Sequence, residues 1–450
     1  MKKWILLFAM AVALMQFAMG QSVVFHKTYN LGPGLSANDI IHTTDGTILL
    51  TGTMDNADEI NNLLVFAVDE NGDSLWTKTY GGDSTMRGIK FTALSDGNYI
   101  IGNQFGVNAN ILKINPQGDS LWSATFPAEY GSECSGLLEL ENGDFIAMQR
   151  VFLLPTSTYF LRTNSEGEIL WSVLSEYGET NFLTSSNEGG FIATGSNGMA
   201  MYMHSIFLEY DQDGNLITDV IYDDFEGISN GADQSPNGDF FLGGFESINY
   251  YYYANIIKTN SLGEFLWNKT YSEISPSWFI TTNTYGEDTI LACGFEDHKL
   301  FVVSIDGEGS LINDLIIDDY EVYFTSSAII QDQYLYVSGY CYNWGDSDRL
   351  FLIKIDLDDF VSGIRNTTLN QQIAVFPNPV KEKLNIKIPV NQSASIHCNI
   401  LDSNGKSIES WSETSPGIVQ HDVSDYNPGI YFLQVINENS SITKKFIITR

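Results

Sequence analysis

The residue types that most often carry out catalysis or bind metals are sparse and scattered in this chain. Its six histidines share no metal-ligand spacing: they are His26, His42, His204, His298, His397 and His421. The sequence contains no HExxH or CxxC pair and no phosphate-binding loop. We therefore assign no catalytic residue and no metal ligand. An active site assembled from distant segments leaves no linear motif, so an enzyme stays an open alternative.

Two acidic turns resemble the beginning of a calcium-binding loop. They are Asp69-x-Asn71-x-Asp73 and Asp211-x-Asp213-x-Asn215, and tyrosines stand where such a loop would close with glutamate. The same turn recurs at Asn115–Gly118 with few charges, so the turn itself is the shared requirement. We predict no cofactor and, at most, weak calcium binding to the acidic surface.

Aromatic residues in irregular segments are the better candidates for ligand binding. A run of four tyrosines is the clearest case, and the full set is Tyr202, Tyr250, Tyr251, Tyr252, Tyr253, Trp278 and Trp344. Aromatic rings near carboxylates suit sugar faces or protein loops. The alternative interpretation is that these rings cap the fold and pack against neighbouring loops.

These segments interrupt a repeat that predicts the architecture. The phrase Asp69-Glu-Asn-Gly72-Asp-Ser-Leu-Trp76 recurs with glycines at 118, 167, 214, 263 and 309, spaced 46 to 49 residues apart. A second phrase, such as Asp96-Gly-Asn-Tyr-Ile-Ile-Gly102, occurs seven times and reads as a tight hairpin turn. Each unit then contains four short strands; in the second unit they are 88–94, 98–104, 110–115 and 119–126. Four-stranded units of about 47 residues are typical of propeller blades.

The two ends of the repeat predict a closed ring. The seventh unit, from about Thr325 to Asp356, has only three strands, and Val24-Phe-His-Lys-Thr-Tyr29 matches the missing fourth one. We predict an all-β, seven-bladed propeller over residues 21–361 whose last blade is closed by the N-terminal strand. The recurring tryptophan is expected to pack between blades. The aromatic candidates fall on the face that carries the long, irregular loops, where specificity usually lies.

The N-terminus has the pattern of a signal peptide. Lys2 and Lys3 precede an apolar run, and Ala18-Met-Gly20 supplies small residues before a predicted cut at Gln21. The predicted signal peptide is therefore residues 1–20, and no later stretch is apolar enough to span a bilayer. The four cysteines are too few and too widely spaced for a disulfide framework. We expect buried thiols, with a Cys293–Cys341 bridge as the alternative.

Charge separates the chain into two parts. The net charge is -34, from 22 basic and 56 acidic residues, which argues against nucleic acid as a partner. Residues 373–450 hold seven basic and seven acidic residues, whereas residues 21–372 hold 13 and 49. We predict a polar linker over 362–372 and a small immunoglobulin-like β-sandwich over 373–450.

The C-terminal segment resembles a known export module. Its landmarks are Val375-Phe-Pro-Asn-Pro379, Ile400-Leu-Asp-Ser-Asn-Gly405, Asn427-Pro-Gly-Ile-Tyr-Phe-Leu-Gln-Val435 and Lys444-Lys-Phe-Ile-Ile448. This pattern is similar to the type A sorting domain of the type IX secretion system, a family of Bacteroidetes. The motif residues are Pro377, Asn378, Pro379, Gly405, Gly429, Tyr431, Lys444 and Lys445.

The resemblance implies partners and a location. The family's domain engages the type IX machinery and is removed by a sortase-like peptidase, which leaves the protein on the outer-membrane surface or released. The repeats themselves resemble quinoprotein-like propellers and other bacterial seven-bladed propellers, without a cofactor constellation. We expect a secreted binding or adhesion module for a glycan or a protein. The alternatives are an extracellular enzyme acting on polysaccharide or peptide, and a surface scaffold without a small ligand.

Overall fold

The structure, a computed structural model, describes most of the chain after residue 21. The described residues are 22–152, 156–186, 189–197, 203–272, 278–286, 289–296, 299–317, 322–342, 348–362, 374–376, 379–388, 396–402, 406–413, 417–436 and 441–449. They divide into two compact units. The first comprises residues up to 360 except 311–314, and the second comprises 361–450 together with those four residues.

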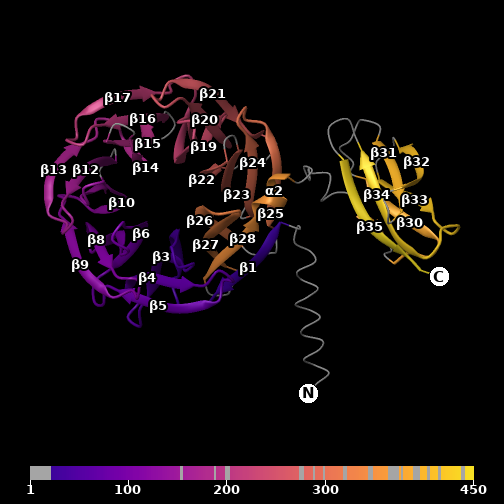
Figure 1. The fold of residues 1–450 in the computed structure, drawn as a ribbon, viewed down its shortest axis with the longest axis horizontal. Helices are drawn as coiled ribbons and strands as arrows, with labels where there is room; N and C mark the ends of the chain where they lie inside the picture. Colours follow the sequence, from indigo (N-terminus) through magenta and orange to yellow (C-terminus); the bar gives the residue numbers. More distant parts are fainter. Residues whose placement is uncertain are drawn as a thin grey trace, which may run out of the picture. The chain divides into compact units, whose positions relative to one another are not determined.

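The first unit is a ring of blades, which we number by the innermost strand of each (Figure 1). Blade 1 contains β2 (Ser36–His42), β3 (Ile48–Asp55), β4 (Asn61–Val68) and β5 (Ser74–Tyr80). Blade 2 contains β6 (Met86–Ala93), β7 (Tyr99–Phe105), β8 (Asn108–Ile114) and β9 (Ser120–Phe126). Blade 3 contains β10 (Ser132–Glu139), β11 (Phe145–Val151), β12 (Ser157–Thr163) and β13 (Ile169–Leu174). Blade 4 contains β14 (Glu179–Ser185), β15 (Phe191–Asn197), β16 (His204–Tyr210) and β17 (Leu216–Ile221).

The remaining blades complete the ring. Blade 5 contains β18 (Gly227–Gln234), β19 (Phe240–Ile248), β20 (Tyr251–Thr259) and β21 (Phe265–Thr270). Blade 6 contains β22 (Trp278–Tyr285), β23 (Thr289–Glu296), β24 (Lys299–Asp306) and β25 (Leu311–Ile317). Blade 7 contains β26 (Val322–Gln331), β27 (Tyr334–Tyr342), β28 (Arg349–Asp356) and, as its outer strand, β1 (Val23–Tyr29). The prediction of seven four-stranded blades is confirmed in the described part of the chain.

Ring closure follows the predicted pairing. β1 is antiparallel to β28, and the register runs from Val23 opposite Ile355 to Tyr29 opposite Leu350. The two ends of the propeller sequence therefore share one sheet, as Figure 1 shows beside the label of β28. The second and third strands of each blade are apolar on both faces because neighbouring blades cover them; β4, for example, is buried from Asn62 to Val68.

Aromatic residues of the outer strands β5, β9, β13 and β21 press on the glycine turn of the next blade. Gly118 in blade 2 has φ +76°, and a Cβ there would lie 3.0 Å from the Trp76 indole of blade 1. Tyr80 and Lys78 of the same strand bind the backbone carbonyl of Gly118 and the carboxylate of Asp119. Trp122, Trp171 and Trp267 meet the corresponding turns of the blades that follow them. The turn needs glycine for two reasons: its φ is positive, and an aromatic ring occupies the space that a Cβ would fill.

The closing strand makes the same contact without a tryptophan. Phe25 lies against Gly72, Tyr29 donates a hydrogen bond to the Gly72 carbonyl at 2.7 Å, and Lys27 pairs with Asp73 at 2.7 Å. The seam between the last blade and the first is therefore packed like an ordinary interface between blades.

The second unit is a small β-sandwich. One sheet contains β29 (Ala374–Phe376), β30 (Lys383–Ile388) and β33 (Gly417–Asp422). The other contains β32 (Ser407–Glu413), β31 (Ile396–Leu401), β34 (Gly429–Ile436) and β35 (Ser441–Ile448). Their buried side chains form one core, which includes Leu384, Ile386, Cys398, Ile400, Leu433 and Phe446.

One local feature differs from expectation, and one matches it. The short helix α2 (Leu357–Ser362) ends the propeller sequence although no helical periodicity precedes it, and Asp356 accepts a hydrogen bond from the backbone N–H of Asp358 at its start. Cys134, Cys293, Cys341 and Cys398 are buried and form no disulfide, so the expected buried thiols are confirmed and the alternative of a Cys293–Cys341 bridge is wrong. The predicted linker, 362–372, lies outside the described residues after Ser362.

We expect Gly118→Ala to destabilise the propeller more than Gly97→Ala. Both glycines have a φ near +80°, but a Cβ at Gly97 meets nothing within 4 Å. The left-handed backbone alone costs about 1–2 kcal/mol, and the collision with Trp76 should add at least about 1 kcal/mol. Urea unfolding of the two variants measures the difference. Equal losses would show that the indole does not press on this turn.

Candidate functional site: the central channel and the loop face

The two faces of the propeller differ in what their loops contain. Turns from first to second strand and from third to fourth strand share one face, and they are short. Turns from second to third strand share the other face with the connections between blades, and we call this face the loop face. The two kinds of loop touch there: the backbone N–H of Ser247, in the β19–β20 hairpin, donates to the carbonyl of Glu226, in the connection from blade 4 to blade 5.

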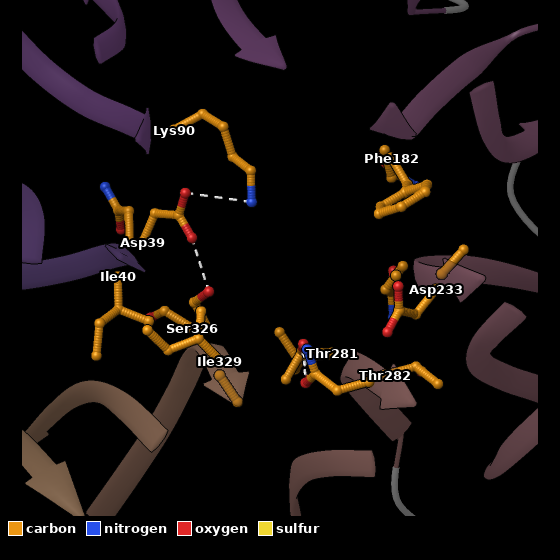
Figure 2. Close-up of a pocket in the computed structure, with 18 of the residues that line it drawn as sticks. Asp39, Ile40, Lys90, Phe182, Asp233, Thr281, Thr282, Ser326 and Ile329 are labelled. Atoms are coloured by element: carbon orange, nitrogen blue, oxygen red, sulfur yellow. Dashed lines mark hydrogen bonds and ion pairs between the residues drawn. The ribbon is translucent and has the colours of Figure 1, made fainter. Parts of the chain in front are cut away.

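The innermost strands enclose a polar channel at the centre of the ring (Figure 2). Its volume is about 520 Å³, and residues from six blades on their inner strands line it, with Arg150 of β11 from blade 3. Each of the seven inner strands has a register shift near its middle, which bulges one residue: Asn38, Ile89, Ser135, Asn181, Asn230, Ile280 and Ser326. The repeated bulge bends every inner strand at the same level of the channel.

Three bulge asparagines tie adjacent blades together. The side-chain amide of Asn38 donates to the carbonyl of Gly88 at 2.6 Å, and Asn181 and Asn230 donate to the carbonyls of Ser229 and Phe279. Each acceptor carbonyl belongs to the residue immediately before the bulge of the next blade. The irregular hydrogen-bond ladder there leaves this carbonyl free to accept from a side chain. Because an amide also has an acceptor oxygen, these residues give the channel wall hydrogen-bonding capacity.

Asp39 joins three blades on one side of the channel. Its carboxylate accepts the Phe91 backbone N–H at 2.8 Å and the Ser327 hydroxyl at 2.7 Å, and it pairs with Lys90 at 3.2 Å. The Asp39 side chain is only 4% exposed, whereas that of Lys90 is 46% exposed. Figure 2 shows Lys90 extending into the channel toward Asp39. Asp39 therefore connects three blades, and Lys90 exposes a positive charge to the channel.

Asp233, from β18, lies on the other side of the channel in Figure 2. One of its oxygens accepts both the backbone N–H and the hydroxyl of Thr284 in blade 6, at 2.7 and 2.9 Å. Burial raises the pKa of the Asp233 carboxyl, and the bonds from Thr284 oppose that shift. Asp233 is thus a second carboxylate that bridges blades.

A charged cluster lies where the inner strands of blades 3 and 4 begin. The Arg150 guanidinium is 2.9 Å from Glu179 and 3.5 Å from Glu133, and it donates to the Asn181 side-chain oxygen. Its Nε atom is buried without a partner in the described part of the chain. Burial raises the pKa of Glu133, although Arg150 lowers it. A carboxyl held this way can exchange a proton nearer neutral pH than an ordinary glutamate.

The longest second-to-third-strand hairpin in the described chain belongs to blade 5. Asn249 and Tyr250 form its two-residue turn, between Ile248 and its partner Tyr251, and both have positive φ, 52° and 67°. Such turns favour Asn-Gly, so a tyrosine in the second place is strained. Tyr250 is 85% exposed and Tyr251 is 60% exposed. Tyr252 packs edge-on against Phe245, and Tyr253 is half-buried.

The other predicted site residues are only partly visible. Tyr202 and Trp344 lie outside the described residues, and of Trp278 only the backbone, in β22, is described. Among the sorting residues, Pro377, Asn378 and Gly405 also lie outside. Pro379 precedes β30, Gly429 begins β34, and Lys444 and Lys445 are in β35. The Tyr431 hydroxyl donates to the Asn427 carbonyl at 2.8 Å, which braces the turn before β34.

Sequence reasoning missed the charged residues of the channel. Lys90 and Arg150 line the channel, and Glu133 and Glu179 flank Arg150, but these residues belong to no motif. Other basic residues recur at equivalent places in several blades, where they form ion pairs within the blade. Examples are Lys113 with Asp96 and Arg162 with Asp144. Lys90 and Arg150 are basic residues at register positions where the other blades have none, and that was the available signal.

The acidic turns have a structural use. Oδ1 of Asp69 accepts the backbone N–H groups of Asn71 and Asp73, and Asp211 does the same for Asp213 and Asn215. The backbone N–H of Asp73 lowers the pKa of the Asp69 carboxyl, and the side-chain amide of Asn215, followed by its backbone N–H, lowers the pKa of the Asp211 carboxyl. Within the described residues, no group of three or more His, Cys, Asp or Glu side chains is placed to hold a metal ion.

Comparison with known families supports the export assignment. Residues 374–449 match the family described as the secretion system C-terminal sorting domain. The protein thus carries a type IX sorting domain and is secreted, either attached to the cell surface or extracellular. In the described part of the chain, no helix has the length and apolarity needed to cross a membrane. No curated protein matches the chain in sequence.

Several solved structures resemble this chain at low sequence identity. A puromycin hydrolase S511A mutant complexed with PGG has a TM-score of 0.51 and 8% identity, and the match covers 80% of this chain and 61% of that one. The polysaccharide lyase Uly1 has a TM-score of 0.48 and 11% identity, covering 73% and 92%. Sqt1 from Chaetomium thermophilum has a TM-score of 0.48 and 12% identity, covering 82% and 97%. At these identities the likeness concerns the fold alone.

We expect Glu133→Gln to make the protein less sensitive to rising pH. Because the folded-state pKa of Glu133 is raised, its favourable contribution is complete below the unfolded-state pKa, about 4.3, and is lost as pH rises through the folded value. The variant should therefore lose less free energy of unfolding between about pH 4 and pH 7 than the wild type. Urea unfolding across this range measures the slope. Glu129→Gln, at an exposed carboxylate, is the control; an unchanged slope in Glu133→Gln would contradict the assignment.

Proposed function

We propose that this protein is a binding or adhesion module that captures an extracellular glycan or protein with the loop face of its propeller. The observation that carries the proposal is the strained, exposed turn at Tyr250. A left-handed tyrosine costs about 1–2 kcal/mol relative to glycine. Because 85% of the Tyr250 surface is exposed to solvent, packing of its ring offsets little of this free-energy cost. A costly aromatic residue at the tip of a hairpin is best explained by contact with a partner.

The contrast with blade 2 strengthens this argument. Its hairpin also has a two-residue loop, Gly106-Val107, and there glycine occupies the position with positive φ. Gly106 is the first residue of its turn, whereas Tyr250 is the second residue of its own. The other non-glycine residues with positive φ in the described chain are Glu59, Asn249 and Asp332, so Tyr250 is the only aromatic one. Strain that persists against an available solution is typical of functional sites.

Export completes the proposal. We propose that the signal peptide is removed before Gln21, that the sorting domain engages the type IX machinery, and that a sortase-like peptidase then releases the propeller. The source would be a member of the Bacteroidetes. Calcium would bind weakly to the acidic surface, which calorimetric titration of the purified chain would measure.

A second candidate function rests on the cluster at Arg150. Glu133, with its raised pKa, and Glu179 flank one guanidinium at the edge of the channel. A proton donor beside a carboxylate suits an extracellular enzyme acting on polysaccharide or peptide. Turnover of a bound glycan or peptide that is lost in Glu133→Gln would favour this candidate. A scaffold role would be favoured if no ligand is found.

We expect Tyr250→Gly to separate binding from stability. Relief of the left-handed strain should raise the free energy of unfolding, by up to about 1 kcal/mol, while removal of the ring should weaken binding. The ligand would first be identified with the full chain on a glycan array and by cross-linking on intact cells. Tyr130→Ala removes an exposed ring from another loop and is the control. If Tyr250→Gly destabilises the protein and leaves binding intact, the ring is structural and the proposal fails.

Deletion of residues 374–450 tests the export route. We expect the truncated protein to accumulate in the periplasm, because the sorting domain supplies the signal for outer-membrane passage. Immunoblotting of cell fractions, with the full chain as control, measures its location. Surface display of the truncated protein would contradict the proposal.

A further inference from the structure

The acidic charge of the propeller leaves basic partners as the best electrostatic match. Residues 21–372 hold 49 acidic and 13 basic side chains. Several of the basic ones are already paired within the fold, including Lys27 with Asp73, Lys78 with Asp119 and Lys258 with Asp239. The uncompensated charge is therefore negative, and it attracts cationic segments while it repels uronic or sulfated sugars.

Part of this charge lies beside the aromatic hairpin. The connection from blade 4 to blade 5 reads Asp223-Asp224-Phe225-Glu226, and its three acidic residues are exposed. The backbone bond of 2.7 Å from Ser247 to Glu226 places the connection against the base of the hairpin. Within the described chain, the carboxylates of Asp223, Asp224 and Glu226 form no hydrogen bond and no ion pair.

Tyrosine rings next to carboxylates match the side chains of lysine and arginine. A cation binds over the face of a tyrosine ring and is attracted further by carboxylates around it. The propeller itself contains such a contact, because the ammonium of Lys354 lies 3.9 Å from the centre of the Tyr334 ring. Tyr250 and Tyr251 offer two exposed rings for the same purpose. A neutral sugar would use the rings but would give no reason for three uncompensated carboxylates beside them.

We propose that the tip of the β19–β20 hairpin and the Asp223–Glu226 connection together bind a lysine- or arginine-rich segment of a partner protein. The rings of Tyr250 and Tyr251 hold the cationic groups by their faces, and Asp223, Asp224 and Glu226 neutralise the remaining positive charge. This inference rests on the proposed function, of which it names the partner class.

The test uses the full chain and a synthetic peptide that alternates arginine and lysine with glycine. Its affinity is measured by calorimetry at low and at physiological salt, beside a neutral oligosaccharide mixture and a peptide with glutamate in place of the basic residues. The double variant Asp223→Asn/Asp224→Asn removes two charges next to the hairpin. The matched control, Asp83→Asn/Glu129→Gln, removes two exposed charges from the connections before blades 2 and 3.

We expect the basic peptide alone to bind, more weakly at higher salt. Asp223→Asn/Asp224→Asn should weaken binding about fivefold, from two partly screened ion pairs, and the control should change it less than about twofold. Tyr250→Gly should also weaken binding, with no loss of melting temperature. Equal effects of the two double variants would overturn the proposal, because the whole acidic surface would then attract the peptide.

Two other outcomes separate this inference from the proposed function. Binding of the neutral oligosaccharide, lost in Tyr250→Gly, would overturn the basic partner and leave the loop face as a binding surface. Ligand binding that is the same in Tyr250→Gly and in the wild type would overturn both the basic partner and the proposed function.

Discussion

The pairing of β1 with β28 is the interaction on which the rest of the propeller depends. Each blade is covered only by its neighbours, so an open ring would expose the apolar flanks of blades 1 and 7. The first strand of the chain prevents this by completing the last blade and by bringing Phe25, Lys27 and Tyr29 to the Gly72 turn of blade 1. Closure in turn places seven inner strands around one axis. The channel exists because they meet there and because their bulges stand at one level.

Comparison of equivalent positions in the blades separates the residues that the fold needs from those that a ligand would need. Trp76 and its counterparts, the glycine turns and the lysine–aspartate ion pairs recur from blade to blade, and each has a packing partner that explains it. Lys90 and Arg150 occur once each on the channel wall. Tyr250 also occurs once, and it occupies a backbone conformation for which glycine is better suited. Residues that depart from a repeat at a cost in stability are the ones that the function must account for.

Much of the fold could be predicted because its local signals repeat. In blade 2 the predicted strand 98–104 corresponds to β7, Tyr99–Phe105, with a shift of one residue. β30 and β34 of the sandwich coincide with apolar runs of the sequence. The strands β32 and β33 have a weak local signal because Ser407–Glu413 and Gly417–Asp422 are rich in polar residues. Their pairing with β31 and β30 stabilises them as strands. The helix α2 was missed because six residues are too few to show a period.

The sequence alone determined the number of blades, the closing strand and the sorting domain, because each depends on a local pattern or a recurring spacing. It also placed the exposed tyrosines on the loop face. Only the tertiary structure brought Asp39 to Lys90 and Ser327, and Arg150 to Glu179, because these groups come from different blades and meet through the curvature of the ring. The conformation of Tyr250 was likewise decided by strand register, since the pairing of Ile248 with Tyr251 leaves two residues to make the turn.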